Sequence, residues 1–228
     1  MFKNPFKELT GFELGLWIVS LAVVTMSFVL SPKNDPLTLF ASLIGVTALI
    51  FVAKGYVLGQ VLTVVFAVFY GIVSYFFAYY GEMITYLFTT SPIALMSVVS
   101  WIRHPYEGTK EVEISRMTKK QITVMLSLTV AVTILFYFIL GALKNANLLV
   151  STVSITTSFL ASYLTFMRSP YYALAYAAND VVLIVLWIMA SFADISYLPM
   201  VACFLMFFVN DIYGFVNWRR IQRRQESK

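Results

Sequence analysis

Two Asn-Asp pairs stand inside long apolar stretches of this chain, at Asn179-Asp180 and at Asn210-Asp211. Lipid tails cannot hydrogen-bond an amide or solvate a carboxylate, so an ionised side chain at that depth costs about 2.5 kcal/mol or more unless it faces protein or water. We therefore expect the pairs to face the inside of a helix bundle and to form one wall of a solute site. The alternative is that they are polar contacts between packed helices.

Helix geometry predicts which neighbours share a face with these pairs. Trp187 follows Asp180 by seven positions and Tyr213 follows Asn210 by three, so each shares a helix face with the earlier residue. Asn179 and Asn210 both lie about 12 Å inside their spans, at a rise of about 1.5 Å per residue. Two amides at matched depth on consecutive helices could converge on one ligand.

Aromatic residues make up 17% of the chain, and most are expected in the core or at the membrane interface. Tyr70 and Trp187 are the best candidates to stack on a flat solute, because the internal repeat described below pairs them. The negative face of an indole favours a cationic ring, and Asp180 or Asp211 could complement its charge. Gln60, close to the end of its span, is a further candidate. Together these residues indicate a flat, polar small molecule that could be cationic.

The composition predicts a membrane protein. Of the 228 residues, 60% are hydrophobic and 12% charged, whereas soluble domains have about half apolar and a quarter charged residues. A membrane-spanning helix needs about 20 apolar residues. Eight stretches meet or approach that length, at about residues 14–30, 37–53, 56–80, 84–102, 122–143, 148–167, 171–192 and 197–218.

The basic residues predict the orientation of the eight spans. With an even number of spans, both termini lie on one side of the membrane, together with a charged linker at residues 103–121. Fourteen Lys and Arg residues fall on that side and only Lys33 and Lys144 on the other, so both termini are expected in the cytoplasm, as for a multi-pass protein of the inner (plasma) membrane. Because the basic residues cluster at span ends, they do not indicate nucleic acid binding.

An internal repeat organises the spans. Shifting spans two to four by 117 residues lays them on spans six to eight, with Tyr70 on Trp187 and Trp101 on Trp218. The two copies have the same orientation, and transport folds built from repeats bind solute where the two halves meet. The alternative is a chance alignment of aromatic-rich spans. The predicted segments are an extra N-terminal helix (1–36), a three-helix repeat (37–102), the cytoplasmic loop (103–121), a linker helix (122–147), a second repeat (148–218) and a basic tail (219–228).

Several kinds of chemistry lack the residues they need. The only His, His104, lies in the loop, so the spans offer neither a bis-His haem site nor a His-rich metal site. No glycine-rich phosphate loop is present, and no nucleophile stands beside a convincing base. We therefore expect no catalytic residues, no metal and no cofactor. Cys203 is expected to be a small buried hydrophobic residue.

Three segments together resemble the PnuC family of vitamin transporters, over roughly residues 37 to 220. They are Asn210-Asp211-Ile212-Tyr213-Gly214-Phe215-Val216-Asn217-Trp218, the span from Asn179-Asp180 to Trp187, and Ser91-Pro92 followed by Trp101-Ile102-Arg103-His104-Pro105-Tyr106. The resemblance implies an all-α membrane fold with a 3+1+3 parallel repeat similar to the SWEET sugar transporters, usually assembled as a homotrimer. It also implies uptake of nicotinamide riboside by facilitated diffusion for NAD synthesis, trapped by a cytosolic kinase.

The resemblance assigns roles to the candidate residues. Trp187 and Tyr70 would stack on the nicotinamide ring, and Asn179, Asn210 and Gln60 would bond its amide and the ribose. The fourth span lacks the Asn and Gln expected of the family, so hydroxyls such as that of Thr90 would contact the ribose instead. Sister groups carry thiamine or riboflavin, which remain alternatives. A receptor that binds without transporting, with the loop and the tail as its output surface, is the alternative of a different class.

Overall fold

The computed structural model describes residues 4–32, 36–76, 80–145 and 147–227, and most of them are helical. The α-helices are α1 (Gly11–Val29), α2 (Pro36–Ala53), α3 (Val57–Phe76), α4 (Tyr80–Thr85), α5 (Ser91–Arg103), α6 (Lys119–Ala142), α7 (Leu148–Phe166), α8 (Tyr172–Ala193) and α9 (Leu198–Glu226). Short turns of other helix types are η1 (Pro5–Glu8), η2 (Tyr86–Thr90) and η3 (Ile195–Tyr197).

The described helices confirm an all-α membrane protein with eight spans. Eight of them are long and apolar enough to cross a bilayer, with α4, η2 and α5 forming one span over Tyr80–Arg103. The end of the last span differs from the prediction, because α9 continues to Glu226 and includes most of the predicted basic tail. The segment after Trp218 has no Pro or Gly, and its Arg, Gln and Glu residues favour helix.

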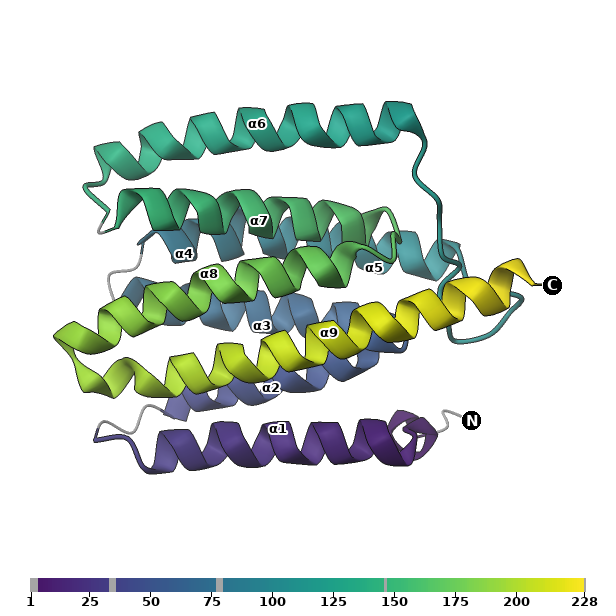
Figure 1. Cartoon of the computed structure of the whole chain (residues 1–228), viewed down its shortest axis with the longest axis horizontal. Helices are drawn as coiled ribbons and strands as arrows, with labels where there is room; N and C mark the ends of the chain where they lie inside the picture. The colour runs from purple at the N-terminus through teal and green to yellow at the C-terminus, as the bar shows by residue number, and fades with distance from the viewer. Residues whose placement is uncertain (1–3, 33–35, 77–79, 146, 228) are drawn as a thin grey trace.

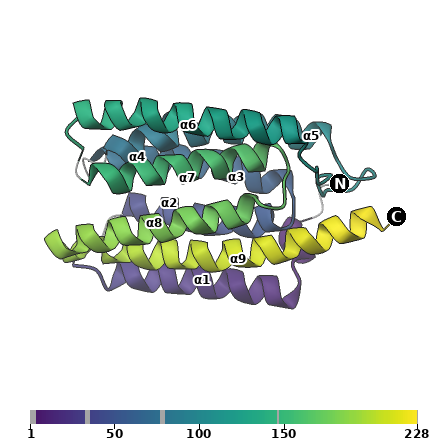
Figure 2. The ribbon, with the colours of Figure 1, turned by 45° about the horizontal axis from the view of Figure 1, so that its top comes forward.

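The helices run roughly parallel to one long axis, with α1 and α6 at opposite edges (Figure 1). Helix α1 packs on α2 and α9, whereas α6 packs on α7. Both chain ends and the α5–α6 loop lie at the same end of the bundle, and the turned view in Figure 2 agrees. This arrangement fits an even number of spans. Lys3, Lys33 and Lys228, which the orientation argument used, lie outside the described residues.

The two predicted three-helix sets contact each other reciprocally. Helix α2 packs on α9, and α5 packs on α7. The Trp101 indole of α5 donates a hydrogen bond to the Thr165 carbonyl at the end of α7 (3.1 Å), and Trp218 of α9 donates one to Val52 O at the end of α2 (2.9 Å). The two indole rings lie 5.4 Å apart. The Trp218 ring is therefore buried at the contact between the two sets, where it packs between the ends of these helices.

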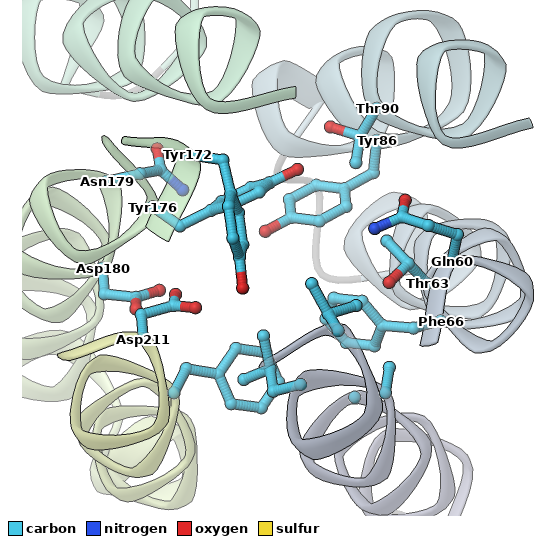
Figure 3. A pocket seen from close by; sticks show the side chains of 15 residues that line it. Gln60, Thr63, Phe66, Tyr86, Thr90, Tyr172, Tyr176, Asn179, Asp180 and Asp211 are labelled. Carbon is cyan, nitrogen blue, oxygen red and sulfur yellow. The ribbon is translucent and has the colours of Figure 1, made fainter. Parts of the chain in front are cut away.

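An irregular turn interrupts the fourth span. In η2, the backbone N–H of Ser91 bonds the carbonyl of Tyr86, five residues back instead of four. Pro92 follows directly and has no N–H of its own, so the ordinary helix ladder cannot continue unchanged through this point. The wider turn directs Tyr86 and Thr90 toward the middle of the bundle (Figure 3).

The α5–α6 loop folds back on the bundle. The backbone N–H of Val112 bonds the carbonyl of Gly55 in the α2–α3 turn (2.9 Å), where Gly55 adopts a left-handed conformation (φ +69°). The side chain of Gln225, near the end of α9, bonds both Ile114 N (2.9 Å) and Val112 O (3.1 Å). The predicted tail therefore continues as a helix that binds the loop.

Candidate binding site

A small cavity lies in the middle of the bundle, between α2, α3 and η2 on one side and α8 and α9 on the other (Figure 3). The sequence argument required a cavity between the two three-helix sets, and one is present. It encloses only about 50 Å³. Its lining residues are Gly45, Ala48, Leu49, Val52, Gln60, Thr63, Phe66, Tyr86, Thr90, Tyr172, Tyr176, Asn179, Asp180, Phe207 and Asp211.

Two carboxyl groups stand side by side in one wall. Asp180 on α8 and Asp211 on α9 are each 3% exposed, and Figure 3 shows their carboxyls turned toward one another. Within the described chain, the Asp180 Oδ2 atom has no hydrogen-bond partner. Adjacent buried carboxylates repel unless they share a proton or face a cation. No Lys or Arg is among the described residues that line the cavity, so a shared proton or a positively charged guest would relieve this repulsion.

Amide and hydroxyl groups line the rest of the polar surface. The amide of Gln60 and the hydroxyls of Thr63 and Thr90 reach the cavity from α3 and η2, opposite Asn179 on α8 (Figure 3). These side chains offer donors and acceptors on both sides of the space. They could bond a guest that carries an amide and hydroxyl groups.

Helix α7 stands behind the cavity and holds some of its side chains in place. Thr157 donates a hydrogen bond to Asn179 Oδ1 (2.8 Å). The hydroxyl of Ser158 shares one with Thr90 (3.3 Å). These hydroxyl groups of α7 are therefore used in contacts between helices, because small hydroxylated side chains allow close approach.

Aromatic rings close the cavity at both ends. Tyr86 packs edge-on against Tyr70, with ring centroids 4.4 Å apart. At the other end Tyr172 packs on Trp218 at 4.6 Å. Tyr176, whose hydroxyl shares a hydrogen bond with Ser162 (3.0 Å), also lines the cavity, as do Phe66 and Phe207. A flat guest in this space would touch tyrosine rings.

Of the eight candidate residues predicted from the sequence, the structure brings four to the cavity and places four elsewhere. Gln60, Thr90, Asn179 and Asp180 line the cavity. Tyr70, Trp187, Asn210 and Tyr213 do not line it.

Trp187 and Tyr70 lie beyond one end of the cavity, where Trp187 Nε1 donates a hydrogen bond to the Tyr70 hydroxyl (3.2 Å). Both are at most 1% exposed. Trp187 is seven residues past Asp180 along α8, so it sits about 10 Å further along the helix axis. The expected direct stacking on a guest is therefore not available in this arrangement, and Tyr86 intervenes.

Asn210 and Tyr213 point away from the cavity, toward α1. Asn210 Nδ2 donates hydrogen bonds to Ser20 Oγ (2.9 Å) and to its own helix, and the Tyr213 hydroxyl donates one to Glu13 (2.9 Å). The expected convergence of Asn179 and Asn210 on one ligand does not occur, because successive residues on a helix point about 100° apart. Asp211 is the residue of α9 that faces the cavity.

Eleven of the fifteen lining residues were not among the eight predicted site residues, and five of these eleven carry a hydroxyl or a carboxyl group. Spacing could have found some of them, since Tyr176 and Tyr172 precede Asp180 by four and eight residues and share its face. The other three are Thr63, Tyr86 and Asp211, of which Asp211 was considered only as an alternative to Asp180 for complementing a positive charge.

Comparisons with known proteins bear on the family and the fold of the chain. The sequence pattern of a family described as nicotinamide mononucleotide transporter matches residues 35–220. A curated relative from Neisseria mucosa, the nicotinamide riboside transporter PnuC, is 25% identical over 231 residues, which cover 99% of this chain and 88% of the relative. A solved structure described as the crystal structure of the vitamin B3 transporter PnuC is similar, with a TM-score of 0.82, 25% identity and coverage of 95% of this chain and 94% of that one.

Proposed function

Because the chain belongs to the nicotinamide mononucleotide transporter family, we propose that it carries nicotinamide riboside across a membrane. The resemblance to PnuC transporters seen in the sequence is confirmed by these relatives. Since the relatives are named transporters, a role in transport is favoured over catalysis. We further propose facilitated diffusion by alternating access, with the riboside used for NAD synthesis.

The charge of the cavity is the observation that carries the choice of substrate. Nicotinamide riboside has a positively charged ring and no phosphate, whereas the mononucleotide named by the family adds a phosphate dianion. The described lining contains Asp180 and Asp211 and no basic side chain. A buried phosphate needs Arg, Lys or several N–H donors, so the cavity favours the riboside over the mononucleotide.

The lining residues suggest a role for each part of the substrate. Asp180 and Asp211 would face the positive ring, and Tyr86 or Tyr176 would stack on it. Asn179, opposite Gln60 and Thr90, would bond the carboxamide and the ribose hydroxyls. In this proposal Trp187 and Tyr70 support Tyr86 instead of touching the substrate.

The size of the cavity implies movement. Small-molecule pockets usually enclose about 300–1,000 Å³, and this cavity encloses about 50 Å³. The two three-helix sets would therefore have to separate for the riboside to enter. The ring pairs Tyr70–Tyr86 and Tyr172–Trp218 lie at opposite ends of the cavity and would open in turn.

Transport by the purified chain in liposomes tests the proposal. We expect saturable uptake of labelled nicotinamide riboside that a protonophore does not abolish, since facilitated diffusion needs no ion gradient. A binding panel of the riboside, its mononucleotide, thiamine and riboflavin should rank the riboside first. Tightest binding of thiamine or riboflavin would assign the chain to a sister group. Binding without flux would identify a receptor.

Three further expectations rest on the family resemblance and on charge. The excess of basic residues at the end that holds both termini favours a cytoplasmic location for that end, in the inner (plasma) membrane. The resemblance implies a homotrimer and trapping of the product by a cytosolic kinase. Native mass measurement of the purified chain tests the trimer, and uptake by kinase-deficient cells, which should reach equilibrium without accumulation, tests the trapping.

A further inference from the structure

A groove between α1 and α9 opens on the surface of the bundle, away from the central cavity. It encloses about 620 Å³, far more than the cavity. We propose that this groove binds an anionic phospholipid, with the acyl chain along an apolar wall and the phosphate at Arg220.

The apolar wall follows one stripe of α9. Val209, Ile212 and Val216 line the groove at spacings of three and four residues, and each is 41–43% exposed. Phe12 and Leu16 of α1 form the facing wall, and Phe12 is 66% exposed. At about 1.5 Å per residue, the stripe runs about 16 Å from Val209 to Arg220. This length suits part of an acyl chain.

One acidic residue in the groove is already satisfied. Glu13 accepts hydrogen bonds from Lys54 Nζ (3.0 Å), the Tyr213 hydroxyl (2.9 Å) and the backbone of Thr10 (2.7 Å). Its carboxylate is 2% exposed and compensates the charge of Lys54. This network closes the floor of the groove and leaves no uncompensated negative charge there.

Arg220 stands where the apolar stripe ends. Its side chain is exposed and lines the groove, and no hydrogen bond or ion pair joins it to another described residue. The next turn carries Arg224, which pairs with Glu111 of the loop. The five charged groups of the groove, three basic and two acidic, leave one positive charge in excess, at Arg220.

The order of these features along α9 favours a lipid over a dissolved anion. The stripe is apolar within the span and basic at its end, which is the order of chain and phosphate in a phospholipid. Basic grooves between membrane helices bind anionic headgroups, and each Lys or Arg near the surface contributes about 1 kcal/mol. Free phosphate would gain the charge interaction but would leave the apolar wall uncovered.

Native mass spectrometry of the full chain in detergent tests the inference, with phosphatidylglycerol, phosphatidylcholine and inorganic phosphate as separate probes. We expect phosphatidylglycerol to remain bound, phosphatidylcholine to bind more weakly and phosphate alone not to bind. Arg220→Ala should weaken phosphatidylglycerol binding about fivefold. Arg223→Ala is the matched control, because Arg223 is exposed on the same helix but lies outside the groove, and it should bind as the parent does.

A second pair of variants tests the apolar wall. Val216→Asn should weaken binding of the same lipid, whereas Val185→Asn, at an equally exposed position of α8 outside the groove, should not. Equal binding by Arg220→Ala and the parent would overturn the inference, as would binding of phosphate alone. It would also be overturned if the variants changed only the subunit number, since the groove would then be an interface between copies. Melting temperatures of all variants confirm that each is folded.

Discussion

The indole of Trp187 donates a hydrogen bond to the hydroxyl of Tyr70 across 3.2 Å, and the two residues are 117 positions apart. This separation equals the offset at which the sequence repeat aligns them. The residues that correspond in the two sets therefore meet at one end of the cavity, and Trp101 and Trp218, also 117 apart, meet beyond the other end. The predicted repeat would pair these same residues, and each contact lies beyond one end of the cavity.

Trp187→Phe should weaken substrate binding although Trp187 does not line the cavity. The change removes the donor to Tyr70, whose ring packs on the lining residue Tyr86. The loss of one buried hydrogen bond, about 1 kcal/mol, corresponds to about fivefold weaker binding if Tyr86 shifts. Calorimetry with nicotinamide riboside measures this change in affinity. Trp17→Phe, which loses a similar bond to Thr47 (3.1 Å) away from the cavity, should leave affinity unchanged.

Asp211→Asn should discriminate a charged ligand from an uncharged one of the same shape. Nicotinamide riboside is cationic, whereas its 1,4-dihydro form is neutral. If Asp211 faces the ring, the variant should bind the cation at least about tenfold more weakly and the neutral form almost as well as the parent does. Paired titrations of the two ligands measure the difference. An equal loss for both ligands would mean that Asp211 acts only through packing.

Thr157→Val should weaken substrate binding although Thr157 does not line the cavity. The Thr157 hydroxyl positions the Asn179 amide through a 2.8 Å hydrogen bond. Valine keeps the shape and removes the donor, at a cost of about 1 kcal/mol, or about fivefold in affinity. Thr123→Val on α6 is the control, because that hydroxyl bonds only its own helix. Identical affinities of the two variants would contradict the positioning role.

Gly45→Ala should narrow the cavity. A Cβ built on Gly45 would lie 2.4 Å from Phe207 Cζ and 3.0 Å from Phe66 Cδ2, and both rings line the cavity. Displacing them costs about 1–3 kcal/mol, so uptake should fall about tenfold or more. Gly15→Ala, where the added atom meets nothing within 4 Å, should keep full uptake. Uptake rates in liposomes at equal protein content compare the two variants with the parent.

Truncation after Arg220 should lower thermal stability. If the segment serves membrane orientation alone, flux should survive its removal. The structure shows that Gln225 bonds the loop at Val112 and Ile114, and that Glu226 pairs with Arg116. Removing them frees the loop, so the melting temperature should fall. Gln225→Ala should give part of the same decrease, whereas Arg223→Ala should give none.

The sequence by itself determined the number of spans, their order and the end of the bundle that carries the basic residues. The physical reason is that a bilayer dictates composition, since each span must be apolar over about 20 residues and Lys and Arg remain at span ends. It also identified Asn179 and Asp180 as inward-facing, because lipid cannot accommodate both an amide and a carboxylate.

Only the tertiary structure decided which polar residue of each helix meets the cavity. Neighbouring residues differ by about 100° in direction, so the packing of α9 against α1 turned Asn210 toward Ser20 and left Asp211 facing inward. The irregular turn η2 brought Tyr86 between the cavity and Tyr70. Helix rotation and such a local irregularity depend on contacts between distant segments, which a single sequence does not specify.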